Sequence, residues 1–352
     1  MANVLDVAAL TMNPQEGNDV SKAVFERTIT GGKLSNHHEI ETGVSMKQQI
    51  VFVGNLAEVG VAISGCGFTA GGQQIPLTEK YWEPTLVGGR LVNCANDLNP
   101  LMKLFKRAQK VNPDYFDKEG SEELGVIVVA VEKAVEKMAN RLVWFGDKAA
   151  ANITGGGVYV DGTLMTLYTP INGLFQQIFT EVTQRVTITE NAGADYAAQA
   201  LPANSALAYL RAMYNLQHPT MHQAKLDGAS LEFQVTRAFA QNYIDSIEDK
   251  SLAFMLQRTE EGSSEYQYRG IPIFVRDDWD GYIALQDNGV KLNIPHRALL
   301  TFKENIPVAT LSTDDLTTLE SWYEKKDKTN IMDFALYIDA KLLEPKLAVV
   351  AY

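Results

Sequence analysis

The segment from Thr30 to Arg90 most constrains the fold, because it contains little that could form a hydrophobic core of its own. Glycine recurs along the whole segment, and short β-prone runs such as Ile50–Val53 and Val59–Ile63 lie between the glycines. Glycine weakens regular elements, whereas β-branched runs favour strands over helices. We therefore expect an extended, twisted excursion of strands with few helical turns, which depends on other surfaces for burial.

The stretch from Tyr266 to Thr310 is predicted to be rich in strands and poor in candidate chemistry. Asn288-Gly289 lies between apolar runs, and both residues accept the positive φ that a tight hairpin turn requires. The predicted strands are Gly270–Val275, Tyr282–Leu285, Val290–Ile294 and a last apolar strand that carries Leu299, Leu300 and Phe302. Pro272 lies near the start of its strand, where a missing N–H is tolerated.

The clearest helix is predicted over Ser121–Phe145. Its apolar residues recur every three or four positions: Leu124, Ile127, Val131, Val135, Met138, Leu142 and Phe145. Ser121 is a competent N-cap, and Gly146 is expected to end the helix in a left-handed conformation. At about 1.5 Å per residue this rod is on the order of 37 Å long, enough to span a domain.

Other elements follow from capping and periodicity. Helices are predicted over 96–109, from about Thr169, over 204–216, over 230–247 and from Ser312, where Asp315 completes a capping-box pattern. Strands are predicted over 332–338 and 346–352. Residues 1 to about 30 are expected to contain little helix, since Asn13-Pro14 suggests a turn.

Composition narrows the classes of function. The 352 residues carry a net charge of −12 and a pI near 5.0. Such a chain repels phosphate backbones, which disfavours sequence-specific nucleic-acid binding without forbidding the enclosure of nucleic acid. The first residues lack the basic region and apolar core of a secretion signal, and no run approaches the roughly 20 apolar residues of a membrane span. We expect a chain made in the cytoplasm, with Cys66 and Cys94 as reduced thiols.

No catalytic, cofactor or metal site is predicted from the histidines. His218 and His222 have the spacing of a helical zinc site, but Pro219 lies between them and the general-base glutamate of the zincin pattern is absent. They are expected to be surface or loop residues. His37 and His38 lie in a polar segment and are expected to face solvent.

The remaining candidates are also weak. Gly155-Gly156-Gly157 lacks the lysine and Ser/Thr of a phosphate-binding loop, which indicates a hinge or loop tip. Asp277, Asp278 and Asp280 surround Trp279 without the spacing of a calcium loop, which indicates a solvated acidic turn.

The order of these parts resembles the major capsid protein of tailed bacteriophages, which has the Hong Kong 97 phage fold. The resemblance covers essentially the whole chain, and Thr169–Gly173 and Gly270–Val275 are most like family sequence. It implies an α+β fold with the following parts: an N-terminal arm (1–30), an extended E-loop (31–92), a peripheral P-domain (93–170 and 299–352) with a spine helix at about 121–145, and an axial A-domain (171–298).

The resemblance also implies a function. The chain would be a major capsid protein that self-assembles through pentamers and hexamers into an icosahedral phage head, enclosing double-stranded DNA without reading its sequence. It would be part of the virion and be assembled in the cytoplasm of the host bacterium. Its partners would be further copies of itself, portal protein, scaffolding protein and decoration proteins, with the scaffolding either separate from this chain or absent. Some relatives join lysine to asparagine between subunits, but the loop lysines Lys33, Lys47 and Lys80 do not by themselves imply that chemistry.

Three aromatic residues are candidate inter-subunit contacts: Phe68, Tyr81 and Trp82 lie on the glycine-rich projection, where apolar side chains are a liability for a monomer. The alternative for all three is packing within their own chain.

Two other functions stay open at this point. One is an encapsulin-like nanocompartment shell of the same fold that packages a protein cargo. The other is an α/β hydrolase or transferase whose site would gather Asp277, His296 and the Gly155 loop.

Overall fold

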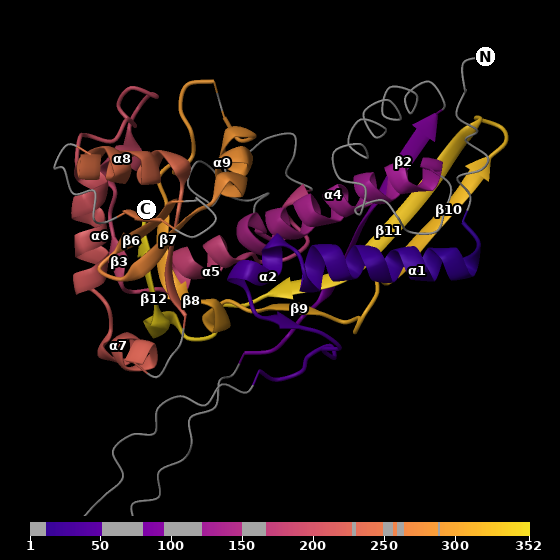
Figure 1. Ribbon diagram of the computed structural model, residues 1–352, viewed down its shortest axis with the longest axis horizontal. Coiled ribbons are helices and arrows are strands. Elements are labelled where there is room, and N and C mark those ends of the chain that lie inside the picture. The colour runs from indigo at the N-terminus through magenta and orange to yellow at the C-terminus, as the bar shows by residue number, and fades with distance from the viewer. Residues whose placement is uncertain are drawn as a thin grey trace, which may run out of the picture.

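The computed structural model describes residues 12–50, 80–94, 122–149, 167–226, 230–248, 256–258, 264–287 and 289–352. Within these ranges two β-sheets lie side by side along the long axis of the molecule (Figure 1). One has five strands and is covered by a long helix. The other has seven strands, with helices packed against it. None of the helices in the described ranges is both long enough and apolar enough to cross a lipid bilayer.

The five-stranded sheet is built around β11 (Thr329–Ala340). β2 (Thr85–Cys94) pairs with it antiparallel over ten residue pairs, from Ile338 opposite Thr85 to Thr329 opposite Cys94. β10 (Thr318–Glu324) pairs with the other side of β11 over Thr329–Ala335, and β9 (Val308–Thr310) pairs with that same side further along, over Ile338–Ala340. β1 (Ile40–Glu41) pairs in parallel with β9. This sheet therefore joins segments from both ends of the chain.

The long helix α4 (Glu122–Phe145) confirms the predicted rod and packs against β11. Val131, Val135, Met138 and Leu142 are buried in the larger hydrophobic core, as their spacing predicts. Gly146 ends the helix for a different reason from the one expected. A Cβ there would lie 2.6 Å from the Leu142 carbonyl oxygen, so the position needs glycine for close approach to Gly173 rather than for a left-handed turn.

The seven-stranded sheet has the order β3-β12-β8-β4-β7-β6-β5. Its strands are β3 (Arg185–Val186), β12 (Ala348–Ala351), β8 (Ala298–Phe302), β4 (Leu231–Val235), β7 (Ile271–Val275), β6 (Ser264–Tyr268) and β5 (Leu256–Arg258). Helices α6 (Ser205–Asn215), α7 (Pro219–Leu226) and α8 (Arg237–Glu248) accompany it (Figure 1). A second core cluster contains Phe233, Phe239, Leu210 and Met213.

Several predictions are confirmed. The helix near Thr169 is α5 (Leu174–Glu181), and the helix over 204–216 is α6. The predicted strands at 270–275, 298–302, 332–338 and 346–352 are β7, β8, β11 and β12. The predicted helix over 96–109 lies outside the described residues. The predicted domain boundary at 298/299 lies at the start of β8. This strand pairs with β4 from before the boundary and with β12 from after it, so the seven-stranded sheet extends across the boundary.

The predicted hairpin around Asn288-Gly289 is wrong. Residues Asp277–Ala284 form helix α9, and no strand follows among the described residues up to 297. Trp279 and Ile283 are four positions apart and both buried, so one helical face enters the core. Asp277, Asp278 and Asp280 lie in the first turn, where negative charge suits the helix dipole.

Two other helix predictions are wrong in whole or in part. The residues after Ser312 form strand β10, because all seven residues of Thr318–Glu324 pair with β11. The helix predicted over 230–247 is strand β4 followed by helix α8. The five residues of β4 are all buried between β7 and β8, although Glu232 and Gln234 alternate with apolar residues; the Gln234 amide donates to Glu232 Oε1 at 2.6 Å.

The first segment contains more helix than predicted. α1 (Pro14–Phe25) is followed by a π-helical turn (Glu26–Thr30) and by α2 (Lys33–His37). Asn13 is the N-cap of α1 and forms a capping box with Glu16, and Pro14 occupies the first turn. Asn-Pro therefore starts a helix here instead of making a turn.

Candidate subunit-contact surfaces

Residues 44–50 and 80–83 form a narrow antiparallel pair that we call the neck. Gln49 and Tyr81 form a β-bridge, and the Ile50 N–H donates to the Lys80 carbonyl at 2.9 Å. The Trp82 N–H donates to the Gln48 carbonyl at 2.9 Å, and the Lys47 N–H donates to the Trp82 carbonyl at 2.8 Å. Residues 51–79, which include Phe68, lie outside the described residues. The neck thus holds Ile50 and Lys80 side by side.

Two of the three predicted contact residues, Trp82 and Tyr81, lie in the neck and differ in burial. Trp82 is 1% exposed and packs in a small core with Val44, Ile50, Ala309 and Leu343. Its indole N–H donates to Glu41 Oε2 at 3.2 Å, and burial raises the pKa of that carboxyl. For Trp82 the structure therefore favours packing within its own chain. Tyr81 is 46% exposed and is not part of this core, so it stays a candidate contact residue.

Two features of the neck were missed from the sequence. Met46 lies in the turn of the 44–50 segment and is 63% exposed. The surface of the neck therefore carries two apolar side chains, Met46 and Tyr81. Lys80 anchors the neck: its ammonium donates to Glu181 Oε2 of α5 at 2.6 Å and to the Leu342 carbonyl. Nothing in the local sequence marks Lys80, because its partners lie far away in the chain.

The return strand is held just beyond the neck. The Glu83 N–H donates to Asp339 Oδ2 of β11 at 2.8 Å, and Lys341 Nζ lies 3.5 Å from the same carboxylate. Burial raises the pKa of Asp339, while Lys341 opposes that rise. From here β2 begins its ladder with β11, so the position of the neck is tied to the five-stranded sheet.

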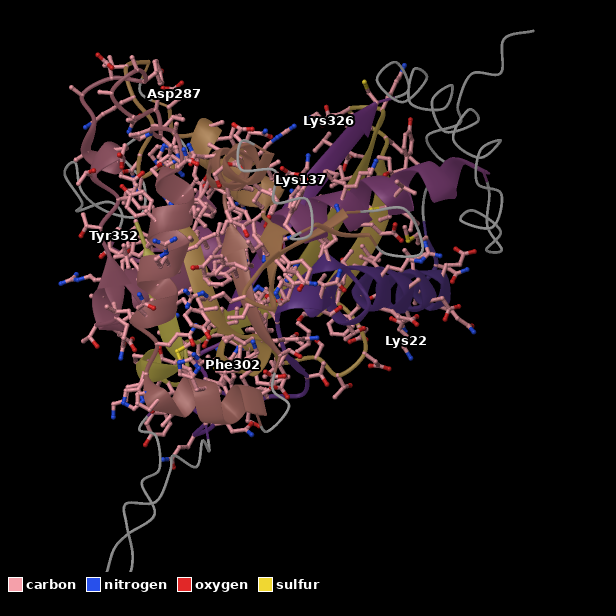
Figure 2. All side chains as sticks on the ribbon, turned by 60° about the vertical axis from the view of Figure 1, so that its left-hand side comes forward. Lys22, Lys137, Asp287, Phe302, Lys326 and Tyr352 are labelled. Carbon is pink, nitrogen blue, oxygen red and sulfur yellow. The ribbon has the colours of Figure 1, made fainter. Side chains whose placement is uncertain are left out.

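A second surface is made by two irregular segments, 189–200 and 285–297, which we call the loop platform. Gln199 bonds to both the N–H (3.0 Å) and the C=O (2.7 Å) of Leu292. Asn191 does the same to His296, at 2.9 Å and 2.8 Å. Each of these two side-chain amides thus both donates to and accepts from one backbone residue of the other segment, as a paired strand residue would. Figure 2 shows Asp287 on this platform, at the end of the molecule remote from Lys326.

The platform presents apolar side chains to solvent. Leu285 is 61% exposed, Val290 56% and Tyr196 46%. The Tyr196 hydroxyl donates to Asp287 Oδ1 at 2.5 Å, which holds the ring at the surface. Large apolar side chains on a cross-braced surface are typical of interaction sites. Only Tyr196, an aromatic residue in an alanine-rich polar loop, offers a sequence signal for this surface.

The junction of the two sheets is filled by aromatic rings and two buried arginines. The Arg276 guanidinium makes paired bonds to Asp278 at 2.9 and 2.7 Å and lies 4.9 Å from the centre of the Trp144 ring. Trp144 in turn contacts Trp279 with 4.6 Å between ring centres. The acidic residues of α9 are therefore partly used in structure, which corrects the expectation of a solvated acidic turn.

The histidines are also structural. His38 is buried, against the expectation that it faces solvent: its Nδ1 lies 2.8 Å from the Ile306 carbonyl and its ring contacts Trp144. Burial, with a further contribution from Arg276, lowers the pKa of His38 to about 3. His37 pairs with the nearly buried Glu232 at 3.1 Å.

Two residues of the alternative enzyme site, His296 and Asp277, lie within the described ranges. His296 Nε2 bonds to the Gln199 carbonyl at 2.6 Å, so its ring serves the loop platform, and burial lowers its pKa. Asp277 is exposed in the first turn of α9. Its neighbour Asp280 accepts the Arg237 N–H at 2.8 Å, and burial raises the pKa of Asp280 to about 6. The Gly155 loop lies outside the described residues. Within the described ranges, no three His, Cys, Asp or Glu side chains converge as metal ligands.

Comparison with known proteins finds relatives only by structure. No family model matches the chain, and no curated protein matches it. A chain from the procapsid of satellite phage P4, in a structure that includes the size determination (Sid) protein, is 14% identical. That match covers 95% of this chain and 97% of the other, with a TM-score of 0.53. Gordonia phage Cozz is 10% identical, with 90% of this chain and 85% of that chain covered and a TM-score of 0.50. The holo-SrpI encapsulin of Synechococcus elongatus is also 10% identical, with 90% and 85% covered and a TM-score of 0.49.

The first two matches extend over nearly the whole chain and show its fold. The chain has the Hong Kong 97-like capsid fold that the order of its elements resembles, with mixed helices and sheets.

Proposed function

We propose that this protein is the major capsid subunit of a tailed phage or prophage, and that copies of it assemble into an icosahedral shell around double-stranded DNA. The observation that carries the proposal is the shared fold with a chain of the P4 procapsid along almost the full length of both chains. A similarity limited to one of the two sheets would be compatible with a different activity in the other part of the chain.

The two surfaces support an assembly role. The neck presents Tyr81 and Met46, and the loop platform presents Tyr196, Leu285 and Val290 at a different site. A closed shell needs heterologous contacts, in which different patches of one subunit meet different patches of its neighbours. Many modest contacts per subunit then add up by multivalency. A structural subunit of this kind needs no catalytic group.

The acidic charge fits the proposed contents. A net charge of −12 gives no electrostatic grip on a phosphate backbone, so the shell would surround DNA without binding it in a fixed register. In the same proposal residues 171–298, which include α6–α8 and most strands of the seven-stranded sheet, form the axial A-domain, and residues 93–170 and 299–352, with α4, β10 and β11, form the peripheral P-domain.

The test is direct imaging of the purified protein. Expressed alone or with the neighbouring phage genes, the chain should sediment as large particles and appear as closed shells by electron microscopy. A soluble monomer or small oligomer under both conditions would contradict the proposal. Nuclease-protected DNA inside particles from infected or induced cells supports a phage head, whereas a protein cargo without DNA identifies a nanocompartment of the same fold.

A further inference from the structure

Five polar side chains near the junction of the two sheets form one continuous chain of hydrogen bonds, which we call the relay. His37 Nδ1 lies 3.1 Å from Glu232 Oε1, and the Gln234 amide donates to that same oxygen at 2.6 Å. The Gln234 side-chain oxygen accepts from Arg276 Nη1 at 2.9 Å. Arg276 then makes its paired bonds to Asp278.

The relay joins elements that are far apart in the sequence. His37 ends α2, Glu232 and Gln234 belong to β4, Arg276 follows β7, and Asp278 lies in the first turn of α9. Figure 1 shows α2 next to α1, at the end nearer the seven-stranded sheet. Helices α2 and α9 are therefore connected through side chains of this sheet.

Both ends of the relay belong to segments that are also held by α4. Before α2, Arg27 pairs with Glu132 of α4 at 2.9 Å. In α9, the Tyr282 hydroxyl donates to the Lys137 carbonyl of α4 at 2.8 Å. The middle of the relay belongs to the seven-stranded sheet. The relay thus runs from a segment attached to α4 into this sheet and back to a second segment attached to α4.

The relay is buried and its polar groups satisfy one another. Gln234 is fully buried, and Glu232 and Arg276 are each 6% exposed. Within the described part of the chain, none of the five side chains contributes a buried polar atom that lacks a hydrogen bond. A buried polar group is costly when it has no partner, so the loss of one link leaves the next member unsatisfied. The members of the relay therefore depend on one another.

Stability alone does not explain a buried network of this kind. Apolar side chains of similar volume usually stabilise a core at least as well, because the loss of hydration offsets the attraction between buried charges. On its opposite face β4 is apolar, with Leu231, Phe233 and Val235 in the second core cluster. Hydrogen bonds, unlike apolar contacts, hold only over a narrow range of distance and angle. The property that the relay adds is a fixed orientation of the elements it joins.

We propose that the relay holds α2 and α9 in one orientation on the seven-stranded sheet, and that this orientation sets the curvature at which copies of the subunit meet. This inference rests on the proposed function, because curvature is a property of a shell. In a closed assembly the same rotation is repeated at equivalent interfaces, so a small change of angle inside each subunit changes the diameter of the particle. The five side chains are positioning residues that act from inside the subunit.

Hydrogen exchange measured by mass spectrometry tests the coupling in the free subunit. His37→Met removes the donor at one end of the relay. We expect exchange at the Trp279 amide, which donates to the Arg276 carbonyl in α9, to become at least about twofold faster, since members of one network are coupled. His37→Asn keeps an N–H donor near the position of Nδ1 and should restore the parental rate. Gln234→Met breaks the middle of the relay and should act like His37→Met.

Electron microscopy of assembled particles tests the effect on curvature. His37→Met and Gln234→Met should give shells whose diameters differ from those of the parent protein or are spread more widely. His37→Asn should give shells of parental diameter. The matched control for the glutamine change is Gln15→Met, at an exposed position on α1, which should alter neither the exchange of α9 nor the diameter.

The outcomes separate this inference from the proposed function. Unchanged exchange at the Trp279 amide in both His37→Met and Gln234→Met overturns the coupling. Faster exchange with shells of parental diameter overturns the role in curvature and leaves the capsid function standing. Loss of the folded subunit in both variants would show that the relay is required for stability, which overturns its assignment as a positioning device. If the parent protein forms no shells, the proposed function fails and the role in curvature fails with it, while exchange in the free subunit still decides the coupling.

Discussion

The guanidinium of Arg297 stacks on the ring of Phe175, 4.5 Å from guanidinium carbon to ring centre. Arg297 immediately precedes β8, and Phe175 belongs to α5. The Arg297 side chain is almost fully buried, donates to the Ile294 carbonyl at 2.9 Å and to the Asn293 carbonyl at 3.1 Å, and also faces Phe145. Burial lowers the pKa of Arg297 to about 9, which leaves the group charged at neutral pH.

Arg297→Ala should therefore destabilise the subunit strongly. The change removes the stacking and leaves backbone carbonyls without their donor, which together should lower the free energy of unfolding by about 3 kcal/mol. Arg297→Lys should recover only part of this, because lysine lacks the planar fork. Arg211→Ala, at an exposed position on α6, is the control and should change the free energy by less than about 0.5 kcal/mol. Urea titration followed by tryptophan fluorescence measures all three.

Trp82→Ala and Tyr81→Ala should fail in different ways. Trp82 is buried, so its truncation should lower the free energy of unfolding by about 3–5 kcal/mol. Tyr81 is half exposed, so Tyr81→Ala should leave the unfolding of the isolated subunit nearly unchanged and reduce the yield of particles. Thermal melting and sedimentation of each variant give the comparison. If Tyr81→Ala assembles as well as the parent protein, Tyr81 is not a contact residue.

Lys80→Met should loosen the neck without unfolding the protein. The variant keeps the length of the side chain and loses its bonds to Glu181 and the Leu342 carbonyl, an effect of about 1–2 kcal/mol on local opening. Hydrogen exchange should become faster at the Ile50 and Trp82 amides and stay unchanged in β4. The control is Lys22→Met on α1, which removes the exposed ion pair between Lys22 and Asp314. Unchanged exchange in the neck would show that the backbone pair alone holds it.

Deletion of residues 51–79 should give a folded subunit that does not assemble. The Ile50 N–H to Lys80 carbonyl bond shows that the two ends lie side by side, so an Asn-Gly turn can join them. The shorter protein should keep the cooperative unfolding of the parent and sediment as a single small species. A deletion over 45–85 would be a poorer test, because it also removes Trp82 and Lys80. Shells built by the 51–79 variant would contradict our assignment of this segment to assembly.

His38 should make the fold sensitive to acid. Its pKa is about 3 in the folded chain and near 6.5 when unfolded, so below pH 6.5 the unfolded state binds the extra proton. The contribution of His38 is therefore complete above pH 6.5 and is lost as the pH falls towards 3, by at most about 1.4 kcal/mol per pH unit. His38→Asn can keep the donor to the Ile306 carbonyl and should flatten this slope. His222→Asn, at an exposed position, should leave it unchanged.

Secondary structure is predicted best from the sequence where one face of an element is buried and the other is exposed, because the apolar residues then repeat with a single period. Val131, Val135, Met138 and Leu142 follow a helical period because a single face of α4 meets the sheet. β11 alternates along most of its length for the corresponding reason. Prediction failed for β10, whose helix-like spacing is overridden by the ladder with β11, and for α9, where Asn288-Gly289 drew attention away from the buried pair Trp279 and Ile283.

The contact surfaces were harder to predict than the fold. Whether Trp82 or Tyr81 faces solvent depends on Ala309 and Leu343, which lie far along the chain. The loop platform depends on two amides, Asn191 and Gln199, that bond to backbone about a hundred positions away, and no local pattern encodes such pairs. The capping box at Asn13, in contrast, has a local sequence signal that was interpreted wrongly as a turn: Asn, Pro and Glu in that order mark a helix start.

The ladder between β2 and β11 has a consequence for synthesis on the ribosome. Its strands come from opposite ends of the polypeptide, so β2 emerges long before its partner exists and must wait through most of translation. The neck, continuous with β2, gains its anchors from Leu342 and Asp339 at the same late moment. The neck therefore cannot be finished before the last residues of the chain have been added, so in the proposed assembly a nascent chain would not yet expose this surface to other copies.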